Sequence, residues 1–135
     1  MKLSIITINY NDAIGLQKTL NSTLMQTCTD FEHVIVDGAS PDNSVEVIEK
    51  YAAEASAKGI KVTWISEKDK GIYNAMNKGI KMASGDYIQI LNSGDCLAAD
   101  TVVADMYSAL KEKEYPEILY GMNKVFLYSY QSLFH

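Results

Sequence analysis

The chain has 135 residues, 47% of them hydrophobic, which is enough to bury one sizeable core but too few for two full domains. Twelve lysine or arginine residues against seventeen acidic residues give a formal net charge of −5, and the basic residues are scattered among acids, which argues against a nucleic-acid partner. Cys28 and Cys96 lack CxxC spacing, so neither a disulfide framework nor a zinc site is indicated. No apolar run approaches the roughly 18 residues of a membrane helix, and too little sequence precedes the first strand-like run for a signal peptide. The compartment we expect is therefore the cytoplasm.

The first part of the chain predicts two strand–helix units. Residues 2–9 (KLSIITIN) are almost continuously apolar, as in a parallel strand that is covered on both faces, and Asn11 or Asp12 can cap the helix that follows. That helix is predicted by apolar residues at helical spacing: Ala13, Leu16 or Gln17, Leu20 and Leu24. Residues 32–37 (EHVIVD) predict a second strand, and Asn43 with Glu46 fits a capping box at the next helix. The apolar face of this second helix is Val45, Ile48, Ala52 and Ala55.

The alternation continues through the second part of the chain. Residues 61–66 (KVTWIS) and 86–91 (DYIQIL) predict a third and a fourth strand, and we expect Gly85 to end the helix between them. The apolar stripe of that helix is Ile72, Met76, Ile80 and Ala83. A fourth helix with inward Val103, Met106 or Tyr107, and Leu110 precedes a short strand in EILYG. Strands that alternate with helices predict a doubly wound, mostly parallel α/β sheet with helices on both faces.

We assign residues 1–120 to one ligand-binding domain and residues 121–135 to a tail. The tail (NKVFLYSYQSLFH and the residues before it) is aromatic and apolar without a clean period, so an edge strand, a helix and the start of a further segment all stay open. We favour a tail that packs or self-associates. The alternative is a membrane-surface role, which would place the chain peripherally at the inner face of the membrane.

Polar residues gather where the predicted strands end. In an open α/β sheet, ligands bind beyond the carboxyl ends of the strands. The residues at these ends are Thr7, Asn9 and Tyr10, then Asp37, then Glu67 and Asp69, and finally Asn92, Ser93 and Asp95. The carboxylates of Asp37, Asp69 and Asp95 would repel one another at one edge, so a hard divalent cation suits the site. Mg²⁺ or Mn²⁺ needs one or two protein carboxylates when phosphates complete its shell, which Asp95 with Asn92 or Ser93 can satisfy. No P-loop and no GxGxxG motif is present, so such a metal would carry much of the phosphate binding.

Four segments carry a resemblance to a known family: SIITINYN, VIVDGASPDNSVEVIEKY, SEKDKGIYNAMNKGIKMASGDYI and LNSGD. Together they resemble the nucleotide-binding half of a family-2 glycosyltransferase of the GT-A fold, collinearly from about residue 2 to residue 120. In that fold the nucleotide-binding half is Rossmann-like. The resemblance implies that a nucleoside diphosphate sugar lies across the strand ends and that the chain serves polysaccharide biosynthesis. The implied reaction is an inverting transfer of the sugar to a hydroxyl acceptor.

The resemblance also implies residue roles. Thr7, Asn9 and Tyr10 would line the base pocket, and Asp37 would bond the base or ribose. Asp69 with Lys70 would approach the nucleoside and diphosphate. Asp95, with Asn92 and Ser93, would hold the metal, since NSGD resembles the DxD segment of the family.

This sequence departs from the family pattern in ways that bear on activity. Asn92 and Gly94 stand where acids are frequent, Gly38 replaces a second acid after Asp37, and Met76 replaces an arginine. The family places its catalytic base and acceptor pocket in a C-terminal half, so no catalytic residue is assigned in this chain. A nucleotide-sugar-binding fragment or degenerate homologue without turnover therefore stays open as the alternative function.

Two other classes fit the sequence less well. A receiver-like signalling module needs an acid pair after its first strand, where this chain has NYND, and a lysine after the fifth, where YGMNK offers only Lys124. A sugar nucleotidyltransferase normally has a glycine-rich, basic loop after the first strand, and NYNDAIG lacks one. We interpret His33, in the second predicted strand, as structural.

Overall fold

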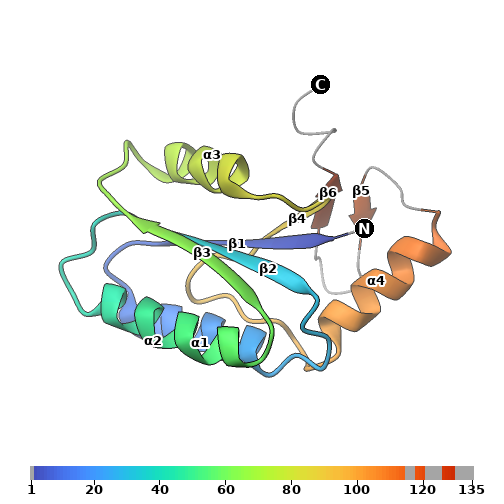
Figure 1. Cartoon of the computed structure of the whole chain (residues 1–135). Helices are drawn as coiled ribbons and strands as arrows, with labels where there is room; N and C mark the ends of the chain where they lie inside the picture. Colours follow the sequence, from blue (N-terminus) through green and yellow to red (C-terminus); the bar gives the residue numbers. More distant parts are fainter. Residues whose placement is uncertain (1, 115–117, 121–125, 130–135) are drawn as a thin grey trace.

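The computed structural model describes residues 2–114, 118–120 and 126–129 (Figure 1). In chain order the elements are β1 (Leu3–Asn9), α1 (Ala13–Leu24), β2 (Phe31–Asp37), α2 (Ser44–Ala57), β3 (Lys61–Ser66), α3 (Ile72–Met82), β4 (Tyr87–Ile90), α4 (Val102–Glu112), β5 (Ile118–Tyr120) and β6 (Phe126–Ser129). The described strands form a six-stranded sheet in the order β3-β2-β1-β4-β6-β5. Strands β3, β2, β1 and β4 run parallel, and β6 is antiparallel to β4 and β5. The predicted doubly wound, mostly parallel α/β sheet is confirmed.

The helices cover both faces of this sheet. Figure 1 shows α1 and α2 on one face and α3 on the other. The larger apolar core lies on the face of α1, α2 and α4, where Leu16, Ile48 and Val103 pack against Ile5 and Ile35 of the central strands. A smaller core, with the side chains of Ile6, Val34 and Ala75 among its members, lies under α3. No helix of the described residues is long and apolar enough to cross a membrane.

Part of the predicted tail forms a strand. Phe126–Ser129 pairs with both β4 and β5, so it lies inside the sheet, and β5 takes the edge position. A strand was among the alternatives for this segment, although at the edge. Residues 121–125 and 130–135 lie outside the described residues, so the boundary at residue 120 and the association of the tail stay predictions.

Two local predictions about helix ends are wrong. The side chain of Asn43 makes no capping bond, and Asp42 takes that place by accepting hydrogen bonds from Ser44 N (3.0 Å) and Ala13 N (3.0 Å). Asp42 thereby joins the starts of α1 and α2. Helix α3 ends in extended backbone at Ala83 and not in a left-handed glycine at Gly85. At the first helix, where Asn11 or Asp12 was predicted as the cap, the capping side chain is Asp12. Its Oδ1 accepts a hydrogen bond from Gly15 N (3.0 Å).

The predicted stripe of α3 is confirmed only in part, because Ile80 and Ala83 pack against the smaller core but the fully buried residues of the helix are others. Its buried residues are Ala75 and Gly79, whereas Ile72 is 54% exposed. A Cβ on Gly79 would lie 2.5 Å from Ile6 Cγ2, so the helix lies close to the sheet along its small residues. Because the small face is the one that packs, Ile72 is left at the end of the helix that faces the carboxyl ends of the strands.

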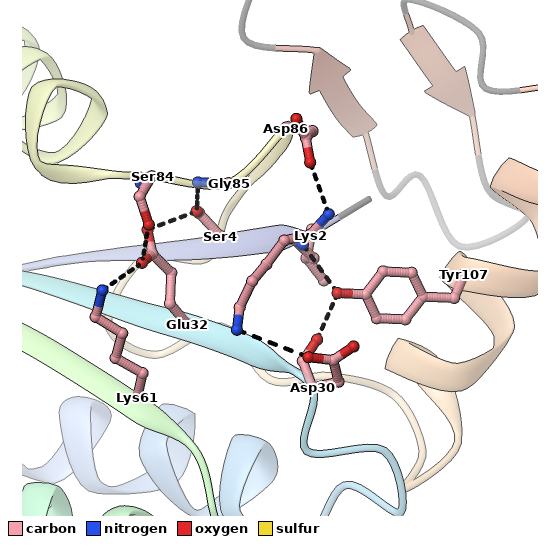
Figure 2. A network of polar contacts seen from close by, with 10 residues as sticks. Lys2, Ser4, Asp30, Glu32, Lys61, Ser84, Gly85, Asp86 and Tyr107 are labelled. Atoms are coloured by element: carbon pink, nitrogen blue, oxygen red, sulfur yellow. Dashed lines mark hydrogen bonds and ion pairs between the residues drawn. The ribbon is translucent and has the colours of Figure 1, made fainter.

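A buried carboxylate locks the opposite end of the sheet (Figure 2). Glu32, 1% exposed on β2, accepts hydrogen bonds from Ser4 Oγ (2.7 Å) and Ser84 Oγ (2.6 Å), with Lys61 Nζ 3.8 Å away. Burial by itself raises the pKa of Glu32, but the bonds from Ser84 and Ser4 and the Lys61 charge outweigh it and hold that pKa below its ordinary value. The ionised Glu32 therefore fastens the segment before β4 onto β1 and β2.

Tyr107 extends this network to α4 (Figure 2). Its hydroxyl accepts from Leu3 N (2.9 Å) and donates to the backbone oxygen of Asp30. Of the two predicted inward residues, Met106 is the buried one and Tyr107 lies at the margin of the core. The helix is thus attached to the sheet by both apolar and polar contacts.

We expect Gly85→Ala to lower the free energy of unfolding by about 1–3 kcal/mol. A Cβ at this position would lie 2.4 Å from Ser4 Oγ and 2.7 Å from Lys2 O, and the backbone oxygen cannot move aside cheaply. Urea unfolding followed by circular dichroism measures the change. Equal stability of the variant and the unchanged chain would show that the segment before β4 does not need this close approach.

Candidate functional site

The carboxyl ends of the four parallel strands are joined by one row of hydrogen-bonded side chains. Ser66, at the end of β3, donates its hydroxyl to Asp37 Oδ2 at the end of β2 (2.7 Å). At the end of β1, Asn9 Nδ2 donates to Asp37 Oδ1 (2.8 Å), while Asn9 Oδ1 accepts from Ser93 Oγ, just after β4 (2.7 Å). Asn9 is paired with Asp37, and Asp37 with Ser66, in the register of the sheet. These side chains therefore lie side by side on one face and bond across the strands.

Asp37 is the anchor of this row. Its side chain is fully buried, and besides Asn9 and Ser66 it accepts bonds from Ser40 N (2.9 Å) and Ser40 Oγ (2.6 Å). Burial by itself raises the pKa of Asp37, but the bonds from Ser40, Ser66 and Asn9 outweigh it and hold that pKa below its ordinary value. Each carboxylate oxygen accepts two hydrogen bonds, so Asp37 is an ionised group whose acceptor sites are all used.

The loop of residues 92–95 after β4 is held on the first turns of α1. Gly94 N donates to Gly15 O (3.1 Å) and Thr19 Oγ1 (2.9 Å), and Asp95 N donates to Asn92 O (2.9 Å). Gly94 has φ +96°, a left-handed conformation that favours glycine. The loop is therefore fixed by its backbone before any ligand arrives.

Two adjoining hollows open at the strand ends. The larger has a volume of about 400 Å³ and is lined by Ile8, Asn9, Tyr10, Asp12, Asp69, Gly71, Ile72, Ala75, Asn92 and Ser93. The smaller has a volume of about 320 Å³ and is lined by Tyr10, Gly38, Ala39, Lys68 and Asp69. Tyr10 and Asp69 line both, so they separate one hollow from the other. A Cβ on Gly38 would lie 2.9 Å from Asp69 Oδ2 and 3.3 Å from Tyr10 Cδ1, so the lack of a side chain there lets both residues approach the end of β2.

The structure brings five of the predicted site residues together around the larger hollow: Asn9, Tyr10, Asp69, Asn92 and Ser93. Asp37 lies beneath them, without exposed surface. Thr7 lies apart, because it is buried and its Oγ1 is 2.7 Å from His33 Nε2. Lys70 and Asp95 are exposed and line neither hollow, although Lys70 lies between Asp69 and Gly71 in sequence and Asp95 lies two residues after Ser93.

Several lining residues were not among the predicted site residues. Asp12 was interpreted only as a helix cap, although it follows Tyr10 closely enough to face the same edge. Gly71, directly before α3, has φ +116°, and its position at the helix start provides no side chain to cap the first turn. The unpaired N–H groups of such a turn favour an anion. In the sequence, the glycine directly before the apolar stripe of this helix was the signal that could have indicated an uncapped helix start.

The residues after β4 fit a hard cation in their chemistry. Asn92 Oδ1 is buried and, among the described residues, has no hydrogen-bond partner, and the carboxylate of Asp95 is exposed two residues beyond Ser93. Carboxylate and amide oxygens are the ligands that Mg²⁺ and Mn²⁺ prefer. In the described part of the chain, no group of three or more His, Cys, Asp or Glu side chains is placed to hold a metal. A cation there would take most of its remaining ligands from water and from phosphate.

Comparison with known proteins identifies the family. The model of Glycosyl transferase family 2 matches residues 4–132. The chain belongs to glycosyl transferase family 2. An uncharacterised glycosyltransferase of Mycobacterium tuberculosis is 38% identical over 120 residues, which are 88% of this chain and 44% of that protein. A PGL/p-HBAD biosynthesis glycosyltransferase of Mycobacterium bovis is 33% identical over 118 residues, which are 87% of this chain and 45% of that protein. This member of the family thus spans less than half of the length of these curated relatives.

Solved structures agree with this assignment. The structure of residues 1–349 of S. aureus TarS in complex with UDP-GlcNAc superposes with a TM-score of 0.76 at 27% identity, over 89% of this chain and 34% of that one. A mannosyltransferase from Pyrobaculum calidifontis, in complex with GDP-Man and Mn²⁺, gives a TM-score of 0.71 at 23% identity, over 80% of this chain and 32% of that one. The latter likeness concerns the fold alone. The GT-A fold implied by the resemblance is confirmed.

Proposed function

We propose that the two hollows at the strand ends bind the nucleoside diphosphate part of a nucleotide sugar, as the donor-binding region of an inverting glycosyltransferase. The observation that carries this proposal is the larger hollow of about 400 Å³, in which residues from the ends of β1 and β4 meet the uncapped start of α3. Its support from relatives is the complex of TarS with UDP-GlcNAc.

The nucleoside is best accommodated in the smaller hollow. Tyr10 offers an aromatic ring, and Asp69 and Lys68 offer an acceptor and a donor beside the backbone of Gly38. A base can stack on such a ring while its polar edge bonds the charged groups. Asp37 serves this site through Asn9 and Ser40, since its own oxygens are occupied. A direct bond of Asp37 to base or ribose stays a prediction, and so does contact of Thr7 with the base.

The diphosphate then lies in the larger hollow, between the start of α3 and residues 92–95. The free N–H groups of the first turn of α3 favour negative charge, and Lys70 precedes that turn. Asp95, Asn92 and Ser93 would hold Mg²⁺ or Mn²⁺, which supplies charge stabilisation for the diphosphate as it leaves. The acceptor hydroxyl would attack the anomeric carbon from the side opposite the diphosphate, and the bond from that carbon to the phosphate oxygen would break. The hydroxyl proton would pass to a general base, a role that no residue of this chain is assigned.

A donor-binding region without turnover is the second candidate function. Asp37 has no free acceptor site, and Asp12 and Asp69, each with one oxygen bonded to a backbone N–H, lie among the residues that would hold the donor and its metal. A general base must reach the acceptor hydroxyl with a free oxygen, and a placed base contributes about 10²–10⁴-fold. We therefore expect this chain by itself to bind donor and to transfer no sugar. Transfer of radiolabel from a nucleotide sugar to lipid, sugar or protein acceptors, above a no-enzyme control, would contradict this expectation.

We expect a nucleoside diphosphate with Mn²⁺ or Mg²⁺ to raise the melting temperature of the chain. A ligand at 100 times its Kd adds about 2.7 kcal/mol to the free energy of unfolding if it binds only the folded state. For a domain of this size the rise is on the order of 5 °C or more. Thermal denaturation with UDP, GDP, ADP and dTDP at millimolar concentration measures it. No shift with any of the four, with or without metal, would remove the donor-binding proposal.

Replacing Asp95 separates the metal site from the fold. Asp95→Asn should abolish the metal-dependent part of the thermal shift and change the stability of the free chain by less than about 1 kcal/mol, because this side chain is exposed. Asp30→Asn is the matched control, since it removes one exposed carboxylate at the opposite end of the sheet, where Asp30 faces Lys2. The control should keep the full shift. Loss of the shift in both variants would point to net charge and not to a metal site.

A further inference from the structure

The buried carboxylate of Asp37 fixes the direction of the hydrogen bonds in the row of side chains at the strand ends. The ionised Asp37 can only accept, so Asn9 must turn its Nδ2 toward Asp37 and its Oδ1 toward Ser93. The amide oxygen of Asn9 has no hydrogen to give, so the hydroxyl hydrogen of Ser93 must point at Asn9 (Oγ to Oδ1, 2.7 Å). Two neighbouring strands thus decide where the proton of Ser93 lies.

The consequence is that the loop after β4 offers acceptors to the larger hollow. With its hydrogen committed to Asn9, the Ser93 hydroxyl has only lone pairs left for a ligand. The carboxylates of Asp12 and Asp69, which line the same hollow, add further acceptors. Phosphate oxygens are themselves acceptors, so they cannot bond the Ser93 hydroxyl or these carboxylates directly.

We propose that Asn9 is a positioning residue that holds Ser93 as an oxygen acceptor and thereby makes binding of the diphosphate at residues 92–95 depend on a divalent cation. This inference rests on the proposed function and concerns the same site. A divalent cation would be attracted both by the acceptors of Ser93, Asp12 and Asp69 and by the phosphate oxygens, and so would let the two sets approach. Asn9 acts through Ser93 and needs no contact with the ligand for this role.

The test is the ratio of the affinity for a nucleoside diphosphate with Mn²⁺ to the affinity without it. Isothermal titration on the whole chain measures both affinities, and electron paramagnetic resonance of free Mn²⁺ gives the metal affinity directly. Asn9→Ala should lower the ratio about tenfold or more, the usual size of the effect of residues that orient metal ligands. Ser93 would then be free to rotate and to donate to phosphate without metal. Ser93→Ala should lower the ratio as well, by removing one acceptor, and it carries the test if Asn9→Ala does not fold.

Ser84→Ala is the matched control for a general loosening of the fold. Like Ser93→Ala it removes one serine hydroxyl that donates to a buried group, here the carboxylate of Glu32 at the opposite end of the sheet (Oγ to Oε2, 2.6 Å; Figure 2). We expect it to lower the melting temperature and to leave the ratio unchanged. Three outcomes would overturn the role of Asn9 while leaving the donor site in place. They are an unchanged ratio in both site variants, a fall of equal size in Ser84→Ala, and metal-independent binding by the unchanged chain. No nucleotide binding by the unchanged chain would overturn the proposed function itself.

Discussion

Replacing Asp37 with alanine should cost the fold more than about 3 kcal/mol of unfolding free energy. The substitution leaves the donors of Asn9, Ser40 and Ser66 without the acceptor that they share. Each buried donor that loses its partner costs about 1–3 kcal/mol, and hydrogen bonds from three different residues end on this carboxylate. Urea unfolding of the variant at pH 7 measures the loss.

Asp69→Ala is the comparison that gives this experiment its meaning. Asp69 also follows a strand, but it is only partly buried and its carboxylate accepts a hydrogen bond from the backbone N–H of Gly71 (3.0 Å). We expect a loss below about 1 kcal/mol in stability together with weaker nucleotide binding. If Asp37→Ala were as stable as Asp69→Ala, the row of hydrogen bonds would not be the support of the strand ends.

Acidification from pH 6.5 to pH 4 should remove about 3 kcal/mol of stability through His33. Burial lowers the pKa of His33 to about 3, and its ring is bonded on both sides, to Thr7 Oγ1 (2.7 Å) and Tyr51 OH (2.6 Å). In the unfolded chain the ring titrates near pH 6.5, so between these two values the unfolded state binds the additional proton. The contribution is fully present above pH 6.5 and is lost as the pH falls toward 3.

The measurement is the free energy of unfolding against pH for the unchanged chain and for His33→Gln. The loss of unfolding free energy between pH 6.5 and pH 5 should be present in the unchanged chain and absent in His33→Gln. Glu32 and Asp37 add their own pH dependence mainly below pH 5, because their pKa values are lowered by the fold from ordinary values of 4.5 and 3.8. Parallel curves for the two proteins would show that His33 is not held neutral by the fold.

The sequence was most informative about which residues share an edge. Parallel strands place their carboxyl ends together, so Asn9, Tyr10, Asp69 and the residues after β4 converge once the alternation of strands and helices is recognised. The same rule cannot tell a ligand-facing carboxylate from a supporting one. Asp37 and Asp69 look alike in sequence, but the neighbours that saturate Asp37 come from three other segments, and the register of the sheet decides which they are.

The predictions that failed depend on contacts between distant segments. Gly85 has the sequence position of a helix-ending residue, but it is needed because β1 passes against it. Asp42 replaces Asn43 as the cap because it also reaches Ala13 of α1. The face of α3 is set by the close approach of Gly79 to Ile6, which a pattern of large apolar residues does not reveal. In each case a partner far along the chain outweighs the local signal.

The location of a bound nucleoside diphosphate is the central claim, and Mn²⁺ provides a direct test of it. Bound Mn²⁺ broadens the NMR signals of nearby amides, and β1 alone separates the two ends of the sheet by roughly 20 Å. In the presence of UDP, GDP, ADP or dTDP, whichever stabilises the chain, we expect broadening of Ser93 and Asp95 and shifts at Tyr10 and Asp69. The amides of Ser84 and Gly85, at the opposite end, should stay sharp and unshifted. Broadening centred on Ser84 and Gly85, or spectra that do not change with nucleotide and Mn²⁺, would contradict a donor site at the carboxyl ends of the strands.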